Sequence, residues 1–320
     1  MLLRFVPADL GASECRTGLG QLPRQRFLAF AHMAQMFIHL YRGDLVQAEE
    51  HFHLGIPLLD GRDFRDVPGR TASTFGHAGW TAWITGRTDV ARERLARGIA
   101  LARENKSPYD IAWAQHMASY LELWLGDAKA GEAAALESLT VSQEVGSPLW
   151  GAMSQVSLGW ARARLGGLGE GIALIREGMS GLVGVGSDVK VRDYQSLADA
   201  QIRDGAIEDA LITVEQALSA NPEERWMRPE SFRLRGRVRL EQGQFQQAEA
   251  DFREAIGLAR SMSAKILELR ATTSLARLLA KQGKRDEARA MLSEIYGWFT
   301  EGFDTADLKD AKALLEELGG

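Results

Sequence analysis

The sequence contains a single cysteine and none of the short motifs that carry common enzyme chemistry. Cys15 alone cannot form an intrachain disulfide, which fits a reducing compartment. The chain has no HExxH metal motif, no GxSxG nucleophile elbow and no GxxxxGK[ST] phosphate-binding loop. The glycine-rich stretch 181–186, GLVGVG, lacks the lysine that such a loop requires. We therefore expect no catalytic residues, no metal site and no cofactor.

The chain also lacks a net positive charge and long apolar runs. The formal net charge is −5, which gives no reason to expect nucleic acid as a partner. No apolar run approaches the roughly 20 residues that a membrane helix needs. The apolar run at the start of the chain is interrupted by Arg4 and ends at Pro7. It is too short for the apolar region of a secretory signal. We expect a soluble cytoplasmic protein without nucleic-acid or membrane partners.

A regular repeat of glycine and small residues runs through the rest of the chain. The clearest copy is 243–258, GQFQQAEADFREAIGL, with Gly243, small Ala248 five positions later, bulky Phe252 at nine and small Ala255 at twelve. A further small residue stands seven positions before most of the glycines. The spacing between successive copies is 38 to 43 residues, a period typical of a solenoid of helical hairpins. The copies begin at Gly43, Gly86, Gly126, Gly166, Gly205, Gly243 and Gly283.

The spacing predicts an all-α fold of about seven helical hairpins. Small residues at fixed positions let two helices cross closely, and the bulky residue fills the gap beside them. Ser107-Pro108 and Ser147-Pro148 predict capped helix starts, and 60–70 is expected to be a loop. We divide the chain into a poorly ordered lead-in at 1–22, a repeat array at 23–303 and a capping helix at 304–320, with Asp304 or Thr305 as its N-cap.

The array resembles the tetratricopeptide-repeat region at the C-terminus of large bacterial signalling ATPases. The most specific stretches are ERWMRPESFRLRGRV and KILELRATTSLARLLAKQGKRDEARAMLSEIYGWFTEGFDTADLKDAKALLEEL. Relatives of that kind join a cyclase domain or a DNA-binding regulator domain, of LuxR or winged-helix type, to an AAA-type ATPase and then to the repeats. The resemblance implies a right-handed α–α superhelix that senses an effector or a partner. The present chain has no Walker A motif and is too short to hold a cyclase.

If the first helix of each hairpin lines the concave surface, as in such arrays, the inward positions predict a groove with two kinds of wall. The aromatic part would come from the second to fourth hairpins and the basic part from the fifth to seventh. This pattern suggests a ligand with an apolar and an anionic part, such as an acidic peptide. Alternatively, the tryptophans belong to the interhelix core and the arginines pair with neighbouring acids. The candidate partner-binding residues are Trp80, Trp83, Trp113, His116, Tyr120, Trp160, Arg192, Arg233, Arg237, Arg270 and Arg277.

Three functions remain open from the sequence. The preferred one is a non-catalytic protein–protein interaction or sensor module within a bacterial signalling or transcriptional ATPase or cyclase system. The second is a sensor that binds a small effector in an aromatic-lined groove. The third is a fragment that shares the name of a cyclase or ATPase without its catalytic residues. We interpret the histidines as core or surface residues rather than metal ligands, because no cysteine cluster or HExxH motif accompanies them. They are His32, His39, His51, His53, His77 and His116.

Overall fold

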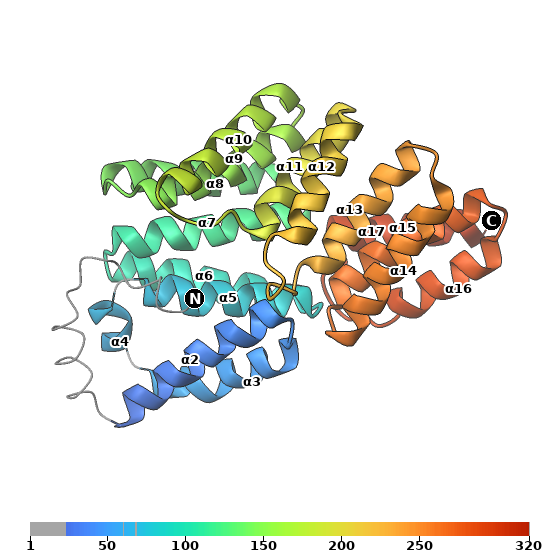
Figure 1. The fold of residues 1–320 in the computed structure, drawn as a ribbon. Coiled ribbons are helices and arrows are strands. Elements are labelled where there is room, and N and C mark those ends of the chain that lie inside the picture. Colours follow the sequence, from blue (N-terminus) through green and yellow to red (C-terminus); the bar gives the residue numbers. More distant parts are fainter. Residues whose placement is uncertain (1–23, 60, 68, 320) are drawn as a thin grey trace.

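The computed structural model describes residues 24–59, 61–67 and 69–319, and their regular structure is entirely helical (Figure 1). A 3₁₀ turn, Ile56–Leu58, follows the helix Leu45–Gly55. The predicted lead-in at 1–22, including Cys15, lies outside the described residues. The α-helices are α2 (Arg24–Arg42), α3 (Leu45–Gly55), α4 (Gly61–Asp66), α5 (Arg70–Ile84), α6 (Thr88–Glu104), α7 (Pro108–Leu125), α8 (Ala128–Glu144), α9 (Pro148–Arg164), α10 (Leu168–Gly184), α11 (Val191–Asp204), α12 (Ile207–Ser219), α13 (Arg228–Glu241), α14 (Phe245–Ser261), α15 (Lys265–Lys281), α16 (Arg285–Tyr296) and α17 (Ala306–Gly319).

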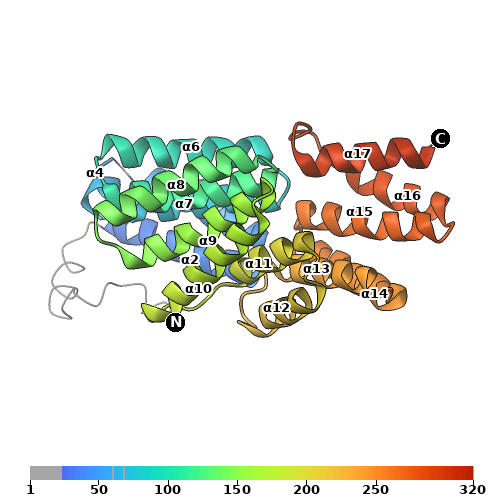
Figure 2. The ribbon, with the colours of Figure 1, turned by 90° about the horizontal axis from the view of Figure 1, so that it is seen from above.

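The helices pair into seven antiparallel hairpins, from α2 with α3 to α15 with α16, and each hairpin packs on the next. Figures 1 and 2 show the stack turning continuously along the chain, with the C-terminal hairpins beside the ends of the earlier ones. The prediction of an all-α solenoid is confirmed. None of the described helices has the length and apolar character needed to cross a membrane.

The seven repeat glycines make the turn inside each hairpin. All of them have positive φ values, between 72° at Gly243 and 103° at Gly166, a region that side chains with a Cβ rarely adopt. Ser107 accepts a hydrogen bond from the backbone N of Asp110 at 3.3 Å, as its N-cap position predicts. Ser147 also precedes its helix, but its side chain makes no capping bond, so that part of the expectation is wrong.

Small residues sit where the two helices of a hairpin cross most closely. A Cβ added at Gly159 of α9 would lie 2.6 Å from the carbonyl oxygen of Gly171 and 2.9 Å from the side chain of Ile175, both in α10. A Cβ at Gly236 would lie 2.5 Å from the ring of Phe252. These contacts join the small position before each turn to the small and bulky positions after it. The repeat therefore encodes the crossing point of each hairpin.

The expected loop at 60–70 contains a short helix, α4, which the sequence pattern did not predict. Its residues Asp63 and Phe64 are buried. The Phe64 ring lies 5.6 Å from that of Phe75, and Asp63 pairs with Arg26 of α2. These tertiary contacts, rather than any local periodicity, hold the segment in a helical turn.

The two ends of the solenoid are joined by contacts between residues far apart in sequence. Arg92 of α6 pairs with Asp304 at 2.7 Å, and the backbone N of Asp89 donates to Glu301 at 2.9 Å. Trp226, between α12 and α13, is fully buried, and its ring stacks on that of Trp80 at 5.6 Å. The second hairpin thus packs against the connection between α12 and α13 and against the segment that precedes α17.

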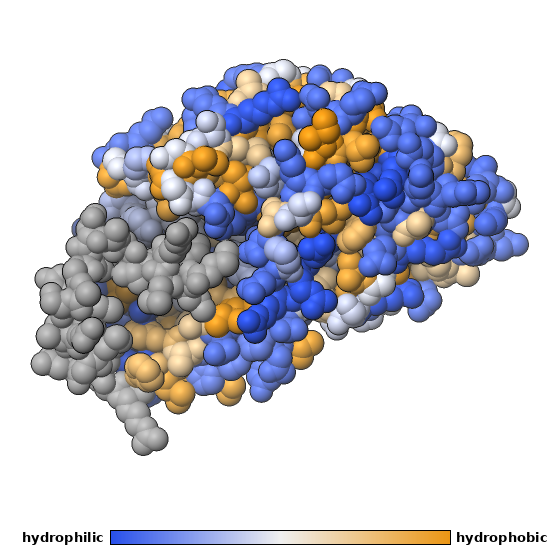
Figure 3. All heavy atoms as spheres, viewed as in Figure 1, coloured by the Kyte–Doolittle hydropathy of each residue, from blue (hydrophilic) through white to orange (hydrophobic). Residues whose placement is uncertain are grey.

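Helix α17 packs against α15 and α16 through a buried apolar face formed by Leu308, Ala311, Leu314 and Leu318. It begins at Ala306, directly after Thr305. The assignment of 304–320 as a cap, like the limits of the array, stays a prediction. On the face seen in Figure 3, apolar residues form small groups separated by polar ones, and hydrophilic residues prevail over the C-terminal hairpins.

A candidate ligand-binding cavity

A cavity of about 930 Å³ lies on the inner side of the superhelix. Its walls come from α11, α13 and α15, and its ends come from α7, α9 and α17. We call it the basic cavity, after the charged side chains that line it: Arg164, Arg192, Arg203, Arg233, Arg237, Arg270, Arg277, Lys281 and Lys309, with Asp199, Glu230, Glu241, Asp307 and Asp310.

The basic cavity carries a surplus of positive charge in a chain that is acidic as a whole. Nine basic side chains face five acidic ones, a surplus of four positive charges, whereas the whole chain has a net charge of −5. Such a local reversal of sign creates a potential that attracts anions and raises their local concentration.

Asp199 of α11 is the centre of the positive cluster. Its carboxylate accepts from Arg237 Nη1 at 3.1 Å and from Arg203 Nε at 3.0 Å, and Arg164 Nε lies 3.8 Å away. The indole N–H of Trp160 also donates to it at 3.0 Å. Three guanidinium groups therefore share one carboxylate, and two of their positive charges have no counterion in this cluster.

The pKa values follow from this crowding. Burial raises the pKa of Asp199, but the three arginines and the Trp160 bond lower it far below its ordinary value. Burial lowers the pKa of Arg237, and Arg233 and Arg203 lower it further against the opposing effect of Asp199. Arginine stays protonated at neutral pH, so these directions report excess positive charge in a partly desolvated place. An added anion would relieve that repulsion.

Two further arginines, in α13 and α15, are each held by a single carboxylate. Arg233 donates to Glu230 with 2.8 and 2.6 Å bonds. Burial raises the pKa of Glu230, but Arg233 lowers it below its ordinary value. Arg270 of α15 binds both oxygens of Asp307 in α17, at 2.9 and 3.0 Å, and donates to the carbonyl oxygen of Trp124 at 2.6 Å.

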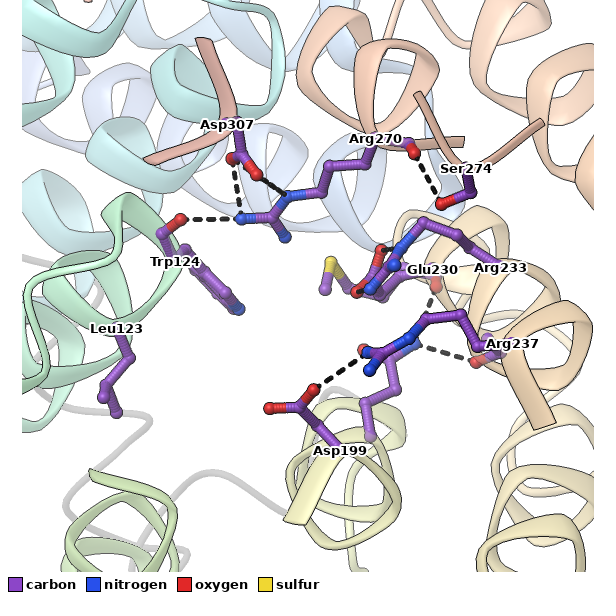
Figure 4. A network of polar contacts seen from close by, with 12 residues as sticks. Leu123, Trp124, Asp199, Glu230, Arg233, Arg237, Arg270, Ser274 and Asp307 are labelled. Atoms are coloured by element: carbon purple, nitrogen blue, oxygen red, sulfur yellow. Dashed lines mark hydrogen bonds and ion pairs between the residues drawn. The ribbon is translucent and has the colours of Figure 1, made fainter. Parts of the chain in front are cut away.

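Figure 4 shows that the side chains of Arg233, Arg237 and Arg270 point from α13 and α15 toward one open space, with Asp199 and Trp124 across from them. Arg270 thereby connects three elements that are distant in sequence: α7, α15 and α17. Arg277 is nearer the surface, where it pairs with Asp310, and about half of each side chain is exposed. The cavity thus has a buried interior and a solvated mouth.

The predicted partner-binding residues fall into two groups in the structure. Those on the walls of the basic cavity are Trp160, Arg192, Arg233, Arg237, Arg270 and Arg277. The others belong to the aromatic core: Trp80, Trp83, His116 and Tyr120 are at most 1% exposed, and Trp113 is half-buried. These five residues therefore lie outside the cavity, whose aromatic lining is Trp124, Trp160, Phe245 and Phe252.

The aromatic core is filled by stacking between hairpins and by Trp226. The rings of Trp83 and Trp124 stack at 4.4 Å, and Trp80 contacts Tyr120, Trp124 and Trp226. The backbone N of Arg225 donates to the carbonyl oxygen of Tyr41 at 2.7 Å, which fixes the Trp226 segment against α2. The ring of Trp226 occupies the space that an open groove would need.

The position of a residue relative to the repeat glycine explains which of the cavity residues could be predicted from the sequence. Positions thirteen, ten, six and three before the repeat glycine account for most of the α11, α13 and α15 residues on the walls. Trp124, Arg164 and Arg203 lie two residues before a repeat glycine, outside that register. Asp307 comes from α17, outside the hairpins. Glu241 and Lys281 of the lining also stand two residues before a repeat glycine, so this further position of the repeat could have indicated the first three residues, but not Asp307.

The described residues hold no group of three or more histidine, cysteine or acidic side chains that could bind a metal ion. The nearest approach is a pair: Nδ1 of His32 lies 2.9 Å from Nδ1 of His51. His77 and His116 are buried among aromatic rings.

Comparison with known proteins supports the repeat fold. The tetratricopeptide-repeat family matches residues 231–262, which comprise most of α13 and all of α14. No curated protein matches the chain significantly.

Three solved structures are similar over almost the whole chain. A Rap protein complexed with Competence and Sporulation Factor has a TM-score of 0.61 at 13% identity, covering 91% of this chain and 80% of that one. NprR in complex with its cognate peptide NprX has a TM-score of 0.55 at 15% identity, covering 90% and 82%. The apo form of RapI has a TM-score of 0.54 at 13% identity, covering 90% and 99%. The chain has the fold of a tetratricopeptide-like α-solenoid.

Proposed function

We propose that this chain is a non-catalytic sensor module that binds an acidic peptide segment in the basic cavity. The observation that carries the proposal is the cluster around Asp199, where three guanidinium groups share one carboxylate on the wall of a cavity of about 930 Å³. Arginine forks match carboxylates in shape as well as charge, and charge-assisted hydrogen bonds are the stronger kind. A peptide with acidic side chains or a free carboxylate supplies the missing counterions.

The similar folds support a peptide rather than a nucleotide or a metabolite. The Rap protein was crystallised with Competence and Sporulation Factor, and NprR with its cognate peptide NprX. The structural similarity extends over at least 80% of each of those two chains. A chain of the same architecture with a charged inner cavity is suited to the same general task.

Occupancy of the cavity would act through bridges that already exist. Arg270 ties the end of α7 to α17, while Asp199 ties α9 and α11 to α13. A ligand carboxylate competes with Asp199 and Asp307 for these arginines and so changes how the hairpins sit against one another. We further propose that such a module acts in the cytoplasm, within a bacterial signalling or transcriptional ATPase or cyclase system, as the sequence resemblance implies.

The second candidate is a small anionic effector. A volume of about 930 Å³ lies within the range of small-molecule pockets. The cavity is lined by apolar residues as well as charged ones, among them Trp160 and Phe252, so an effector with an anionic and an apolar part would fit it. Binding of a free dicarboxylate, such as glutarate, with no gain from a peptide of equal charge would favour this candidate.

The test is binding of short acidic peptides to the wild type, Arg237→Gln and Arg176→Gln. Arg176 is the matched control, since it pairs with the exposed Asp209 and lies outside the cavity. Arg237 is preferred to Arg233, because Arg233→Gln would leave the buried carboxylate of Glu230 without its ion-pair partner. We expect Arg237→Gln to weaken binding by about 1.5–3 kcal/mol, and Arg176→Gln to leave it unchanged. Equal affinities of all three proteins would refute the site.

A further inference from the structure

Two buried polar side chains that line the basic cavity each carry atoms without a hydrogen-bond partner. Arg192 is 3% exposed and Gln195 is 5% exposed, and both line the cavity. They are three residues apart on α11 and therefore share one helix face. Nε and Nη1 of Arg192 and Oε1 of Gln195 have no partner. Buried polar atoms are rarely left in this condition, because each costs about 1–3 kcal/mol.

The guanidinium of Arg192 is held in place by its surroundings without using these two donors. Its central carbon lies 5.3 Å from the ring centroids of both Trp80 and Tyr120. Asp193 Oδ1 is 3.8 Å from Nε, beyond hydrogen-bond distance. The Asp193 carboxylate is already occupied, since it accepts from the Tyr120 hydroxyl at 2.8 Å and from a backbone N–H at 2.9 Å.

The orientation of the Gln195 amide is fixed by chemistry. Its Nε2 donates to the carbonyl oxygen of Met227 and to Oγ of Ser231, both at 2.8 Å. Because a carbonyl oxygen can only accept, the NH₂ group must face Met227. The carbonyl of Gln195 is therefore the end that is left free, as an acceptor.

The charge around Arg192 distinguishes this place from the rest of the cavity. Two carboxylates, those of Asp193 and Glu224, act electrostatically on Arg192 and already offset its positive charge. Burial raises the pKa of Glu224, which shows that further negative charge is costly here. A carboxylate ligand would also meet the free carbonyl of Gln195 without a proton to donate to it. A neutral group with one acceptor and one donor satisfies both side chains.

We propose that Arg192 and Gln195 form a subsite for a carboxamide, the side chain of a ligand asparagine or glutamine. The carboxamide oxygen accepts from Arg192 and its NH₂ donates to Gln195. This inference rests on the proposed function and deepens it: the ligand is a peptide whose acidic part binds the arginines of α13 and α15 and whose amide side chain enters this subsite. A ligand without the amide leaves buried polar atoms unpaired and is rejected on that account.

The test uses short synthetic peptides with a fixed pair of glutamates and alanine elsewhere, in which each alanine in turn is replaced by Gln, Met or Glu. Met is close to Gln in shape but cannot form the two bonds. For the wild type we expect one position at which Gln binds at least about 10-fold more tightly than Met or Glu, the equivalent of one unpaired buried group. Gln195→Leu should reduce that preference to less than about 3-fold.

Folding is checked by circular dichroism and the urea midpoint, because Gln195 also supports Met227 and Ser231. The comparison of peptides on the wild type alone remains decisive where the variant is unstable. Equal binding of the Gln and Met peptides at every position, with binding of the acidic pair retained, would overturn the subsite and leave the proposed function standing. No binding of any acidic peptide to the folded wild type would overturn both.

Discussion

Replacement of Asp199 by alanine should destabilise the protein because one carboxylate holds three arginines. The side chain is only 9% exposed and accepts from Arg237, Arg203 and the indole of Trp160. Removing one partner of a buried ion pair costs about 3–5 kcal/mol. Arg203 and Arg237 are 38% and 30% exposed and regain water in the variant. We therefore expect the lower end of that range, a loss of about 3 kcal/mol.

The assay is urea unfolding followed by circular dichroism, with hydrogen exchange to locate the loss in α9, α11 and α13. Asp209→Ala is the control, because Asp209 and its partner Arg176 are both 56% exposed. Exposed ion pairs contribute about 0–1 kcal/mol. An Asp199→Ala variant within 1 kcal/mol of the wild type would refute the idea that this carboxylate organises the cluster.

The pH dependence of the same variant supplies a second check. The pKa of Asp199 is lowered on folding, so its contribution is fully present above its unfolded pKa and is lost as the pH falls through the folded value. The difference between wild type and Asp199→Ala should be constant between pH 7 and pH 5 and should shrink below about pH 4. Asp199→Asn should raise the affinity for acidic peptides, since the cavity surplus increases by one charge. A fall in affinity would contradict this.

Three further predictions concern the solenoid itself. Gly159→Ala should cost about 1–3 kcal/mol in urea unfolding, because its Cβ meets the Gly171 carbonyl oxygen. Gly151 has open space around it, so Gly151→Ala should raise the free energy of unfolding by about 0.5–1 kcal/mol. Equal changes in stability for the two variants would refute the assignment of Gly159 to the helix crossing. Trp226→Ala should cost about 3–5 kcal/mol; a change below 1 kcal/mol would contradict its role in closing the superhelix. Burial lowers the pKa of His77 to about 3, so His77 should contribute a fall in stability of about 2 kcal/mol between pH 7 and pH 5. Burial also lowers the pKa of His116, so the fall in His77→Gln should be smaller by that amount rather than absent. The same fall in both proteins would contradict a buried neutral His77.

The hairpins could be predicted from the sequence because their determinants are local. A residue with positive φ is needed at each turn, and glycine supplies it at all seven positions. The small residue before the turn faces the bulky residue after it, as Gly79 faces Leu95 and Gly236 faces Phe252. These contacts lie within about 16 residues of sequence, so a fixed spacing records them.

The closure of the superhelix depends on small rotations between successive hairpins, which no spacing records. The pair formed by Arg92 and Asp304 joins residues 212 apart in sequence. Trp226 lies between hairpins, outside the repeat, so nothing in its surroundings marks it as the residue that packs on Trp80. The sequence therefore predicts which residues face inward in the last three hairpins, but not that the aromatic ones of the earlier hairpins are covered.

The central claim is that the basic cavity holds the acidic part of a peptide. The most direct measurement is a crystal structure of the chain with the tightest-binding acidic peptide from the binding experiment. The account predicts a peptide carboxylate within hydrogen-bond distance of Arg237 or Arg270, between α11, α13 and α15. A peptide bound on the convex surface, with these arginines still paired to Asp199 and Asp307 alone, would contradict it.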